Sequence, residues 1–368
     1  MDDAAAMARA LALAEQGRRT AAPNPWVGCV LVNRDEVVGE GFHRAPGEPH
    51  AEALALRQAG ERARGGTAYV TLEPCSHHGR TPPCADALIA AGVGRVVVAV
   101  LDPDRRVAGQ GVARLRAAGV VVEVGVGSEA ARRSLAPYLH QRLTGRSYCL
   151  LKAATSVDGR TAAADGSSRW ITGPAARADA HALRADSQAV VVGAGTAMAD
   201  LPSLTVRDVP DPPACQPLRV LLDARGRVPP KGPLFDPTLA PTLVIATEQA
   251  DRDAVAAWRR AGAEVELVPP AAGGVDLAAV LELLGRRGVL QALFEGGAGV
   301  HGALVAAGLA DRLVLYVGGC LLGERGRPLA AWPGPDAIDA APRWRLLDAR
   351  VLDGDVRLEY EPARPELD

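Results

Sequence analysis

The residues with the clearest chemistry are His50, Glu52, Cys75 and Cys84, in the segments PHAE and EPCSHHGRTPPC. His50 and Glu52 fall in the first turn of an expected helix, Cys75 follows an expected strand, and Cys84 begins the next helix. One imidazole and two thiolates are zinc ligands of the preferred type, and three of them leave a fourth tetrahedral position for water. The spacing therefore predicts a zinc site with an open position.

An open zinc site lowers the pKa of its bound water and so supplies hydroxide as a nucleophile. Glu52 is not needed as a ligand, and its carboxylate can carry the proton of that water to a leaving nitrogen. These features are typical of zinc-dependent base deaminases, whose general form is H-x-E…P-C-x-x-C. Here eight residues separate the two cysteines instead of two, and they include His77, His78 and Arg80.

Two other interpretations of these residues stay open. A closed structural zinc site would take His77 or His78 as its fourth ligand, and a zinc-stabilised binding module would turn nothing over. Neither has a use for the Glu52 carboxylate. Incidental buried thiols are a reasonable interpretation of the other cysteines, Cys29, Cys149, Cys215 and Cys320.

The second half of the chain carries a weaker signal in two glycine-rich segments. GAGT (193–196) follows an apolar run, and GGAG (296–299) follows another and opens an expected helix. Each could present backbone N–H groups to a phosphate at a helix start. Neither is the full G-x-G-x-x-G fingerprint, so glycines that serve only as turn residues remain an alternative.

The elements that must position these residues alternate between strand-like and helix-like runs, in two series that join near residue 145. The first series predicts a helix near the N-terminus, a hairpin of 26–32 and 37–43, helices at 49–59, 82–92, 111–119 and 128–145, and strands at 67–73, 95–100 and 120–126. The second predicts strands at 148–156, 187–193, 218–224, 241–247, 263–269, 290–296 and 312–318, helices at 174–186, 250–261, 276–287 and 299–307, and a closing hairpin through Asp353-Gly354. We therefore expect two α/β domains, 1–146 and 147–368, with largely parallel sheets.

Composition excludes several other classes of protein. The 368 residues carry 41 Lys and Arg against 43 Asp and Glu, a formal net charge of −2. This balance argues against nucleic-acid and anionic-membrane partners. No stretch approaches the roughly 18 consecutive apolar residues of a membrane span. The N-terminus begins with acidic charges and Arg9 interrupts its apolar run, unlike a signal peptide. Six cysteines are too few for a disulfide scaffold, so a cytoplasmic location is expected.

Longer stretches of text are specific enough to suggest a family. They include APNPWVGCVLV, the run PCSHHGRTP, LKAATSVDGRTAAADGSSRWITG, LRADSQAVVVGAGTAMADLPSLTVR and FEGGAGVHGALVAAGLAD. Over nearly its whole length the chain resembles the bifunctional riboflavin-biosynthesis deaminase/reductase family. The resemblance implies a cytidine-deaminase-like α/β/α sandwich followed by a dihydrofolate-reductase-like α/β domain.

The resemblance also implies two reactions and two cofactors, and we expect the chain to form a homo-oligomer. The first reaction is hydrolytic deamination of 2,5-diamino-6-(5-phosphoribosylamino)pyrimidin-4-one at zinc (Zn2+). The second is reduction by NADPH of the ribosyl group of 5-amino-6-(5-phosphoribosylamino)uracil to ribityl. The alternative is a zinc deaminase of another free pyrimidine, a nucleoside or a tRNA base, with an inactive or divergent second domain. The near-neutral charge argues against tRNA.

Site residues follow from the resemblance by position. Zinc would bind His50, Cys75 and Cys84, with Glu52 as the catalytic proton carrier. The deaminase pocket would be lined by Asn24, His43, Arg80 and Asp102. NADPH would contact Ala154, Trp170, Thr196, Asp200, Gly297, Ala298, Gly299, Val300, His301, Gly302 and Ala303. The reductase substrate would contact Lys152, Ser168, Arg184, Leu204, Arg207 and Glu295.

Some of these positions carry a chemical argument or a departure from the family. Arg184 and Arg207 suit bidentate binding of a phosphate. Lys152 and Asp158 could protonate or help open the ribosylamine, although Asp158 fits a strand-end ion pair equally well. Arg80 stands where related chains often have Lys. The chain reads ADLP where the family usually has ADDP, so Leu201 removes a charge near the expected cofactor.

Overall fold

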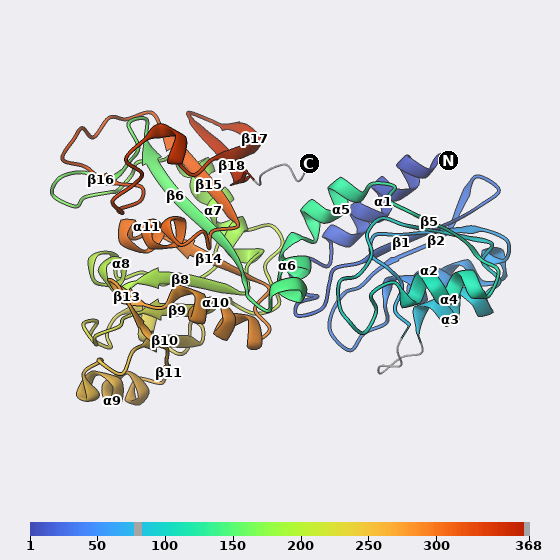
Figure 1. Ribbon diagram of the computed structural model, residues 1–368, viewed down its shortest axis with the longest axis horizontal. Coiled ribbons are helices and arrows are strands. Elements are labelled where there is room, and N and C mark those ends of the chain that lie inside the picture. The colour runs from blue at the N-terminus through green and yellow to red at the C-terminus, as the bar shows by residue number, and fades with distance from the viewer. Residues whose placement is uncertain (77–82, 364–368) are drawn as a thin grey trace. The chain divides into compact units, whose positions relative to one another are not determined.

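The computed structural model describes residues 1–76 and 83–363 and divides into two compact units, Met1–Gly145 and Arg146–Asp368 (Figure 1). None of the described helices has the length and apolar content needed to cross a membrane.

The first unit is built on a five-stranded mixed sheet. Its helices are α1 (Asp3–Glu15), α2 (Ala51–Ala59), α3 (Cys84–Ala90), α4 (Gln110–Ala117), α5 (Ser128–Ser134) and α6 (Ala136–Thr144), and its strands are β1 (Gly28–Asn33), β2 (Glu36–Phe42), β3 (Thr67–Val70), β4 (Arg95–Val98) and β5 (Val121–Val124). The strand order is β2-β1-β3-β4-β5. β1 runs antiparallel to both β2 and β3, whereas β3, β4 and β5 are parallel. The expectation of a largely parallel sheet is therefore wrong for the pairings of β1 with β2 and with β3.

Small residues bring α2 close to the sheet and so set the place of the residues at its start. A Cβ atom on Gly39 of β2 would lie 2.1 Å from the Ala55 carbonyl oxygen, and one on Gly41 would lie 2.7 Å from that of Ala51. Apolar residues of α2, α3 and α4 pack together with one face of the sheet. α1 covers the other face (Figure 1).

The helix expected over 128–145 is broken into α5 and α6 at Leu135. Pro137 lies in the first turn of α6 and has no backbone N–H, so it cannot donate the helical hydrogen bond to residue 133. The Leu139 N–H donates to the Leu135 carbonyl and starts the new helix. Because of this break, α6 is a helix separate from α5, and its own contacts are described below.

The second unit is built on a nine-stranded sheet. Its helices are α7 (Pro174–Ala185), α8 (Ala194–Asp200), α9 (Arg252–Arg260), α10 (Leu277–Arg286) and α11 (Ala298–Ala306). Its strands are β6 (Tyr148–Ser156), β7 (Arg160–Ala162), β8 (Ala189–Gly193), β9 (Leu218–Leu222), β10 (Thr242–Ala246), β11 (Glu264–Leu267), β12 (Pro270–Ala271), β13 (Gly274–Val275), β14 (Gln291–Glu295), β15 (Arg312–Gly318), β16 (Arg327–Pro328), β17 (Trp344–Leu352) and β18 (Asp355–Pro362). The order in the large sheet is β11-β10-β9-β8-β14-β6-β15-β18-β17.

Most of this sheet is parallel. Of its described strands, β18 alone runs against it, antiparallel to both of its neighbours β15 and β17. β8, β14 and β6 are adjacent and parallel. Their carboxyl ends therefore meet at one edge, which is where ligands bind in open α/β sheets. The expected strands and helices are present. The sequence interpretation did not foresee α8, the β12–β13 pair or the β7–β16 pair.

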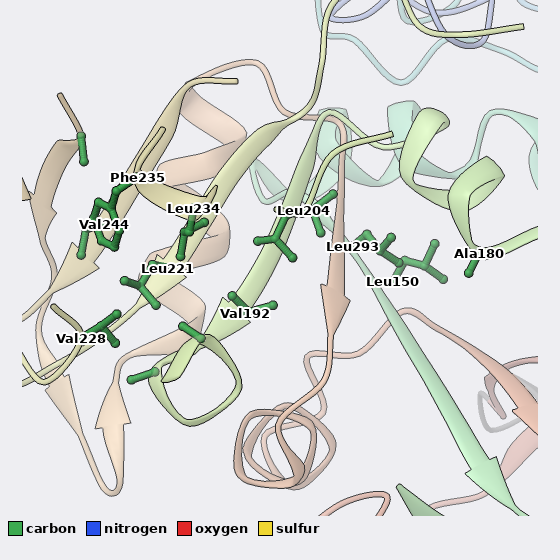
Figure 2. Packing of buried hydrophobic residues seen from close by; sticks show 14 of the residues in the cluster. Leu150, Ala180, Val192, Leu204, Leu221, Val228, Leu234, Phe235, Val244 and Leu293 are labelled. Carbon is green, nitrogen blue, oxygen red and sulfur yellow. The ribbon is translucent and has the colours of Figure 1, made fainter. Parts of the chain in front are cut away.

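Apolar side chains fill both faces of the second sheet. On one face Val192, Leu221 and Val244 pack beneath Leu234 and Phe235 (Figure 2). The same cluster includes Trp258 of α9, whose ring is fully buried and whose Nε1–H donates to the Val228 carbonyl at 2.8 Å. On the other face, α10 and α11 cover a second cluster. These two layers hold β8, β14 and β6 rigidly beneath the site at their ends.

Candidate active sites

Three metal-ligating side chains converge in the first unit. His50 Nδ1 lies 3.3 Å from Cys84 Sγ and 3.6 Å from Cys75 Sγ, and all three donor atoms lie within 4.8 Å of one another. Zinc with Zn–S bonds of about 2.3 Å and Zn–N bonds of about 2.0 Å separates tetrahedral donors by roughly 3.5–3.8 Å. The donor set and its spacing fit zinc.

Local structure brings these donors together. His50 is the residue that precedes the first turn of α2, and Cys84 is the first residue of α3. The Cys84 N–H donates to Cys75 Sγ at 3.3 Å, and the Ala85 N–H donates to the Cys75 carbonyl at 3.1 Å. Hydrogen bonding with Cys84 and His50 lowers the pKa of the Cys75 thiol, although burial opposes it. Cys75 is thus prepared as a thiolate ligand.

Glu52 lies inside the same pocket and is almost fully buried. Burial raises the pKa of its carboxyl, and the nearby His50 acts in the opposite direction. A carboxyl with a raised pKa is suited to accept and return a proton near neutral pH. Among the described residues the metal-ligating cluster consists of the three donors alone. His77, His78 and Arg80 lie outside the described residues.

Two residues expected in the deaminase pocket lie beside the metal cluster. The Asn24 Nδ2–H donates to His43 Nε2 at 3.1 Å, and the His43 Nδ1–H donates to the Pro49 carbonyl at 3.3 Å. This assignment makes His43 the neutral Nδ1–H tautomer. The His43 ring packs edge-on against His50 with centroids 5.3 Å apart. Burial lowers the pKa of His43, which favours the neutral ring.

Asp102 is joined to the cysteine loop through Glu73. The buried Glu73 carboxylate accepts hydrogen bonds from the backbone N–H groups of Asp102 at 3.3 Å, Gly109 at 2.9 Å and Val112 at 3.1 Å. Glu73 is two residues before Cys75, so it ties the Asp102 loop to the metal loop. Burial raises the pKa of Asp102 itself. The sequence interpretation missed Glu73, whose only signal is its position in the EPC segment.

The second unit holds a cluster of charged side chains on β6, β14 and α7. Lys152 and Glu295 are opposite each other on these parallel strands. Arg184 of α7 donates two hydrogen bonds to Glu295, from Nε to Oε1 at 2.6 Å and from Nη2 to Oε2 at 2.7 Å. Burial raises the pKa of Glu295, but Arg184 and Lys152 outweigh it and lower that pKa to about 2. Burial lowers the pKa of Lys152.

Arg184, which the sequence predicts to bind a phosphate, makes its bidentate contact with Glu295 in this structure. Two of its nitrogens bind Glu295, and Nη1 donates to the Thr205 carbonyl at 2.9 Å. Arg207 is exposed, and its backbone N–H donates to His181 Nδ1 at 3.2 Å. The sequence interpretation missed His181, which contacts the Arg207 backbone. His181 lies one helical turn before Arg184 on α7, and this spacing could have indicated that the two side chains share a helix face. Leu204 is buried beside this segment.

The two glycine-rich segments lie against each other. A Cβ on Gly297 would lie 3.3 Å from Thr196 Oγ1, and one on Gly193 would lie 2.9 Å from Val300 Cγ2. Gly296 and Gly297 have φ values of +83° and +91°, which favour glycine. The GAGT and GGAG segments therefore form one backbone surface at the ends of β8 and β14.

The other expected cofactor residues differ in exposure. Gly299, Ala303 and Asp200 are exposed, while Ala154 and Ala298 are partly buried. His301 is buried, and its Nε2 lies 3.3 Å from the Phe294 carbonyl. A Cβ on Gly302 would lie 2.2 Å from the Ala331 carbonyl oxygen, so this glycine permits close packing. The His301 side chain and the lack of a side chain at Gly302 therefore both contribute to packing in the protein interior.

Three further positions that the sequence analysis singled out, Asp158, Ser168 and Trp170, precede α7 in the chain. Trp170 is 69% exposed, with the Arg177 guanidinium 4.2 Å from its ring centroid, and Ser168 is partly buried. Asp158 accepts hydrogen bonds from the Ser156 hydroxyl at 2.5 Å and from the Gly323 N–H at 2.7 Å. The Asp158 carboxylate therefore connects the end of β6 to the loop at Gly323. These hydrogen bonds give Asp158 a structural role that requires neither a proton transfer nor an ion pair.

A zinc-type donor set with a buried acid in one α/β unit, and a cluster of charged side chains beside glycine-rich segments in the other, define a two-domain deaminase and reductase. Residues 1–100 match the family model described as the cytidine and deoxycytidylate deaminase zinc-binding region, and residues 147–358 match that of the RibD C-terminal domain. The chain belongs to the RibD family of riboflavin biosynthesis proteins.

Relatives align over almost the whole chain. The riboflavin biosynthesis protein RibD of Escherichia coli is 44% identical over 97% of this chain and 99% of its own length. That of Chlamydia pneumoniae is 45% identical over 96% of this chain and 94% of its own. One structure of Acinetobacter baumannii RibD superposes with a TM-score of 0.88 at 41% identity, covering 98% of this chain and 99% of that one.

These findings confirm the resemblance and the α/β fold class. They also confirm a bifunctional deaminase and reductase of riboflavin biosynthesis, with a zinc-binding deaminase domain and an NADPH-dependent reductase domain.

Proposed function

We propose that residues 1–146 deaminate 2,5-diamino-6-(5-phosphoribosylamino)pyrimidin-4-one and that residues 147–368 reduce 5-amino-6-(5-phosphoribosylamino)uracil. The observation that carries this proposal is the cluster of three zinc donors beside the buried Glu52. A Thermotoga maritima protein described as a diaminohydroxyphosphoribosylaminopyrimidine deaminase/5-amino-6-(5-phosphoribosylamino)uracil reductase supports the substrates. Its structure has a TM-score of 0.86 and 30% identity, covering 98% of this chain and 99% of that one.

In the deaminase, His50, Cys75 and Cys84 would hold zinc, which when bound activates water as a nucleophile. Glu52 takes the proton of that water and passes it to the leaving nitrogen, a transfer that its burial and raised pKa support. Asn24 and His43 form a hydrogen-bonded pair at the edge of this cluster, and they orient the pyrimidine.

In the reductase, NADPH when bound supplies the hydride. The backbone of the GAGT and GGAG segments binds its phosphates, and the exposed Trp170 ring contacts it. Lys152, whose pKa burial lowers, would donate a proton to the ribosyl ring oxygen as the bond from that oxygen to C1 breaks and C1 accepts the hydride. Glu295 orients Lys152 and is itself held by Arg184. Arg207 remains available for the substrate phosphate.

We propose further that the chain acts on small phosphorylated pyrimidines, without nucleic acid or membrane, as a cytoplasmic homo-oligomer. The six cysteines are free thiols, as a reducing compartment favours. Exposed Leu346 and Val351 on the edge strand β17 support self-association. Sedimentation velocity of the full chain tests this, because a monomer at micromolar concentration would contradict it.

The test of the proposed function is the Glu52→Gln variant with both substrates. Loss of the proton carrier should lower the rate of ammonia release by about 10²–10⁴-fold. Zinc content and NADPH oxidation with 5-amino-6-(5-phosphoribosylamino)uracil should stay at the wild-type level. Cytidine and adenosine serve as comparison substrates for the wild-type chain. A variant that deaminates at the original rate, or a wild-type chain that prefers cytidine, would contradict the proposal.

A further inference from the structure

Helix α6 contacts two loops that carry proposed substrate residues. It lies beyond residue 100, where the match to the deaminase zinc-binding region ends. Its Tyr138 contacts Asp102, and its Arg142 contacts the segment that precedes Asn24. The zinc donors and Glu52 all lie on other elements, so α6 adds something to the site that the shared deaminase segment does not contain.

Tyr138 fixes the Asp102 carboxylate. The Tyr138 side chain is 3% exposed, and its hydroxyl donates to Asp102, with oxygen–oxygen distances of 3.1 Å to Oδ2 and 3.2 Å to Oδ1. Burial raises the pKa of Tyr138, so the hydroxyl keeps its proton. The Asp104 N–H donates to Asp102 Oδ1 at 2.9 Å. Asp102 is therefore held from its own loop and from α6.

Arg142 connects Tyr138 to the Asn24 segment. Its guanidinium lies 4.8 Å from the centroid of the Tyr138 ring. Its Nη2–H donates to the Pro23 carbonyl at 3.3 Å, and its Nε lies 3.5 Å from Asp104 Oδ2. A planar guanidinium can serve an aromatic face, a carbonyl and a carboxylate at once, whereas an ammonium cannot. Arg142 thereby links the backbone before Asn24 to the Asp104 side chain and to the Tyr138 ring.

We propose that Tyr138 and Arg142 are positioning residues that preorganise Asp102 and Asn24 to bind the deaminase substrate. This inference rests on the proposed function of the first unit. Groups held in their binding geometry before the substrate arrives reduce the entropy that binding loses. Because the hydrogen bonds of Tyr138 and Arg142 reach Asp102 and the Pro23 carbonyl rather than the zinc donors or Glu52, we expect their removal to act on substrate affinity and to leave the chemical step unchanged.

The first test is Tyr138→Phe, which removes only the hydroxyl. We expect KM for the diaminopyrimidine substrate to rise about tenfold, the effect of one hydrogen bond to a charged acceptor. We expect kcat to stay within about twofold, because preorganisation acts on binding. Zinc content and NADPH oxidation should not change. An unchanged KM, or a loss of zinc or of kcat, would overturn the proposal, because a structural role alone explains those results.

The second test asks whether Tyr138 acts through Asp102. In an Asp102→Ala background, Tyr138→Phe should cause no further loss of kcat/KM, because the hydroxyl has no carboxylate to hold. An equal loss in both backgrounds contradicts the proposal.

The third test compares arginine variants. Arg142→Ala should raise KM several-fold, and Arg142→Lys should restore only part of the affinity. Arg133→Ala on α5 is the control and should have no effect, because Arg133 is paired with the exposed Glu129 at the surface of the described structure. Full rescue by lysine would show that charge alone suffices and would overturn the geometric role of Arg142. If the wild-type chain does not deaminate this substrate, the proposed function fails before any variant is compared.

Discussion

Replacing Glu295 by Gln tests the buried charge cluster of the second unit. The carboxylate forms two short bonds with Arg184, at 2.6 and 2.7 Å, and the two side chains are 9% and 16% exposed. The substitution keeps the shape of the side chain but removes its charge. Arg184 then keeps its positive charge in a nearly buried place without a carboxylate partner, which is strongly unfavourable.

The size of the effect follows from the pKa of Glu295. A carboxyl whose pKa falls from its usual 4.5 to about 2 on folding contributes about 3 kcal/mol to the free energy of unfolding at neutral pH. Because the folded pKa is the lower one, this contribution is complete above pH 4.5 and is lost as the pH falls toward 2. The variant should therefore be about 3 kcal/mol less stable than wild type at pH 7, and the difference should shrink in acid.

Urea unfolding of the full chain at pH 7 and pH 3 measures both quantities. Four of the five tryptophans lie in the second unit, so fluorescence reports mainly on its unfolding. Glu248→Gln, at an exposed position of the same unit, is the matched control and should behave as wild type. Equal stability of the Glu295→Gln variant and wild type at pH 7, or a difference that grows in acid, would refute the reasoning.

Three further changes have definite expected outcomes. Gly28→Ala should destabilise the first unit by about 2 kcal/mol or more in thermal unfolding, because its Cβ would lie 1.9 Å from the Ala10 carbonyl oxygen; Gly354→Ala, where a Cβ meets nothing within 4 Å, is the control. Cys84→Ser should abolish tight zinc binding, measured by elemental analysis, and ammonia release, while NADPH oxidation persists. Arg207→Ala should raise the reductase KM for the phosphorylated substrate about tenfold with little change in kcat, and an unchanged KM would exclude Arg207 as its phosphate ligand.

Local patterns were sufficient wherever the information lies within a few residues. The strand 148–156 was predicted with the bounds that β6 has. The places of His50 at the start of α2 and of Cys84 at the start of α3 also follow from local signals, such as the prolines before α3 and Gly60 after α2. Helix and strand periodicity and turn residues act over one or two turns, so the sequence expresses them directly.

Failures of prediction had equally physical causes. Pro137 broke a helix that the apolar pattern alone continued. The antiparallel pairing of β1 with β3 depends on strands that are far apart in the chain, and no local pattern specifies a partner. For the same reason, α6 was predicted only as the end of a longer helix, and its contacts with the deaminase pocket were not foreseen.

The sequence by itself therefore determined the donor types of the zinc site, the acid beside them and the alternation of strands and helices, because each is a property of neighbouring residues. Only the tertiary structure decided which partner each charge takes. Arg184 meets Glu295 across 111 residues, a partner that its residue type alone does not indicate. Tyr138 meets Asp102 across 36 residues. Such contacts arise from the packing of distant elements around a shared core, and a linear pattern does not encode them one by one.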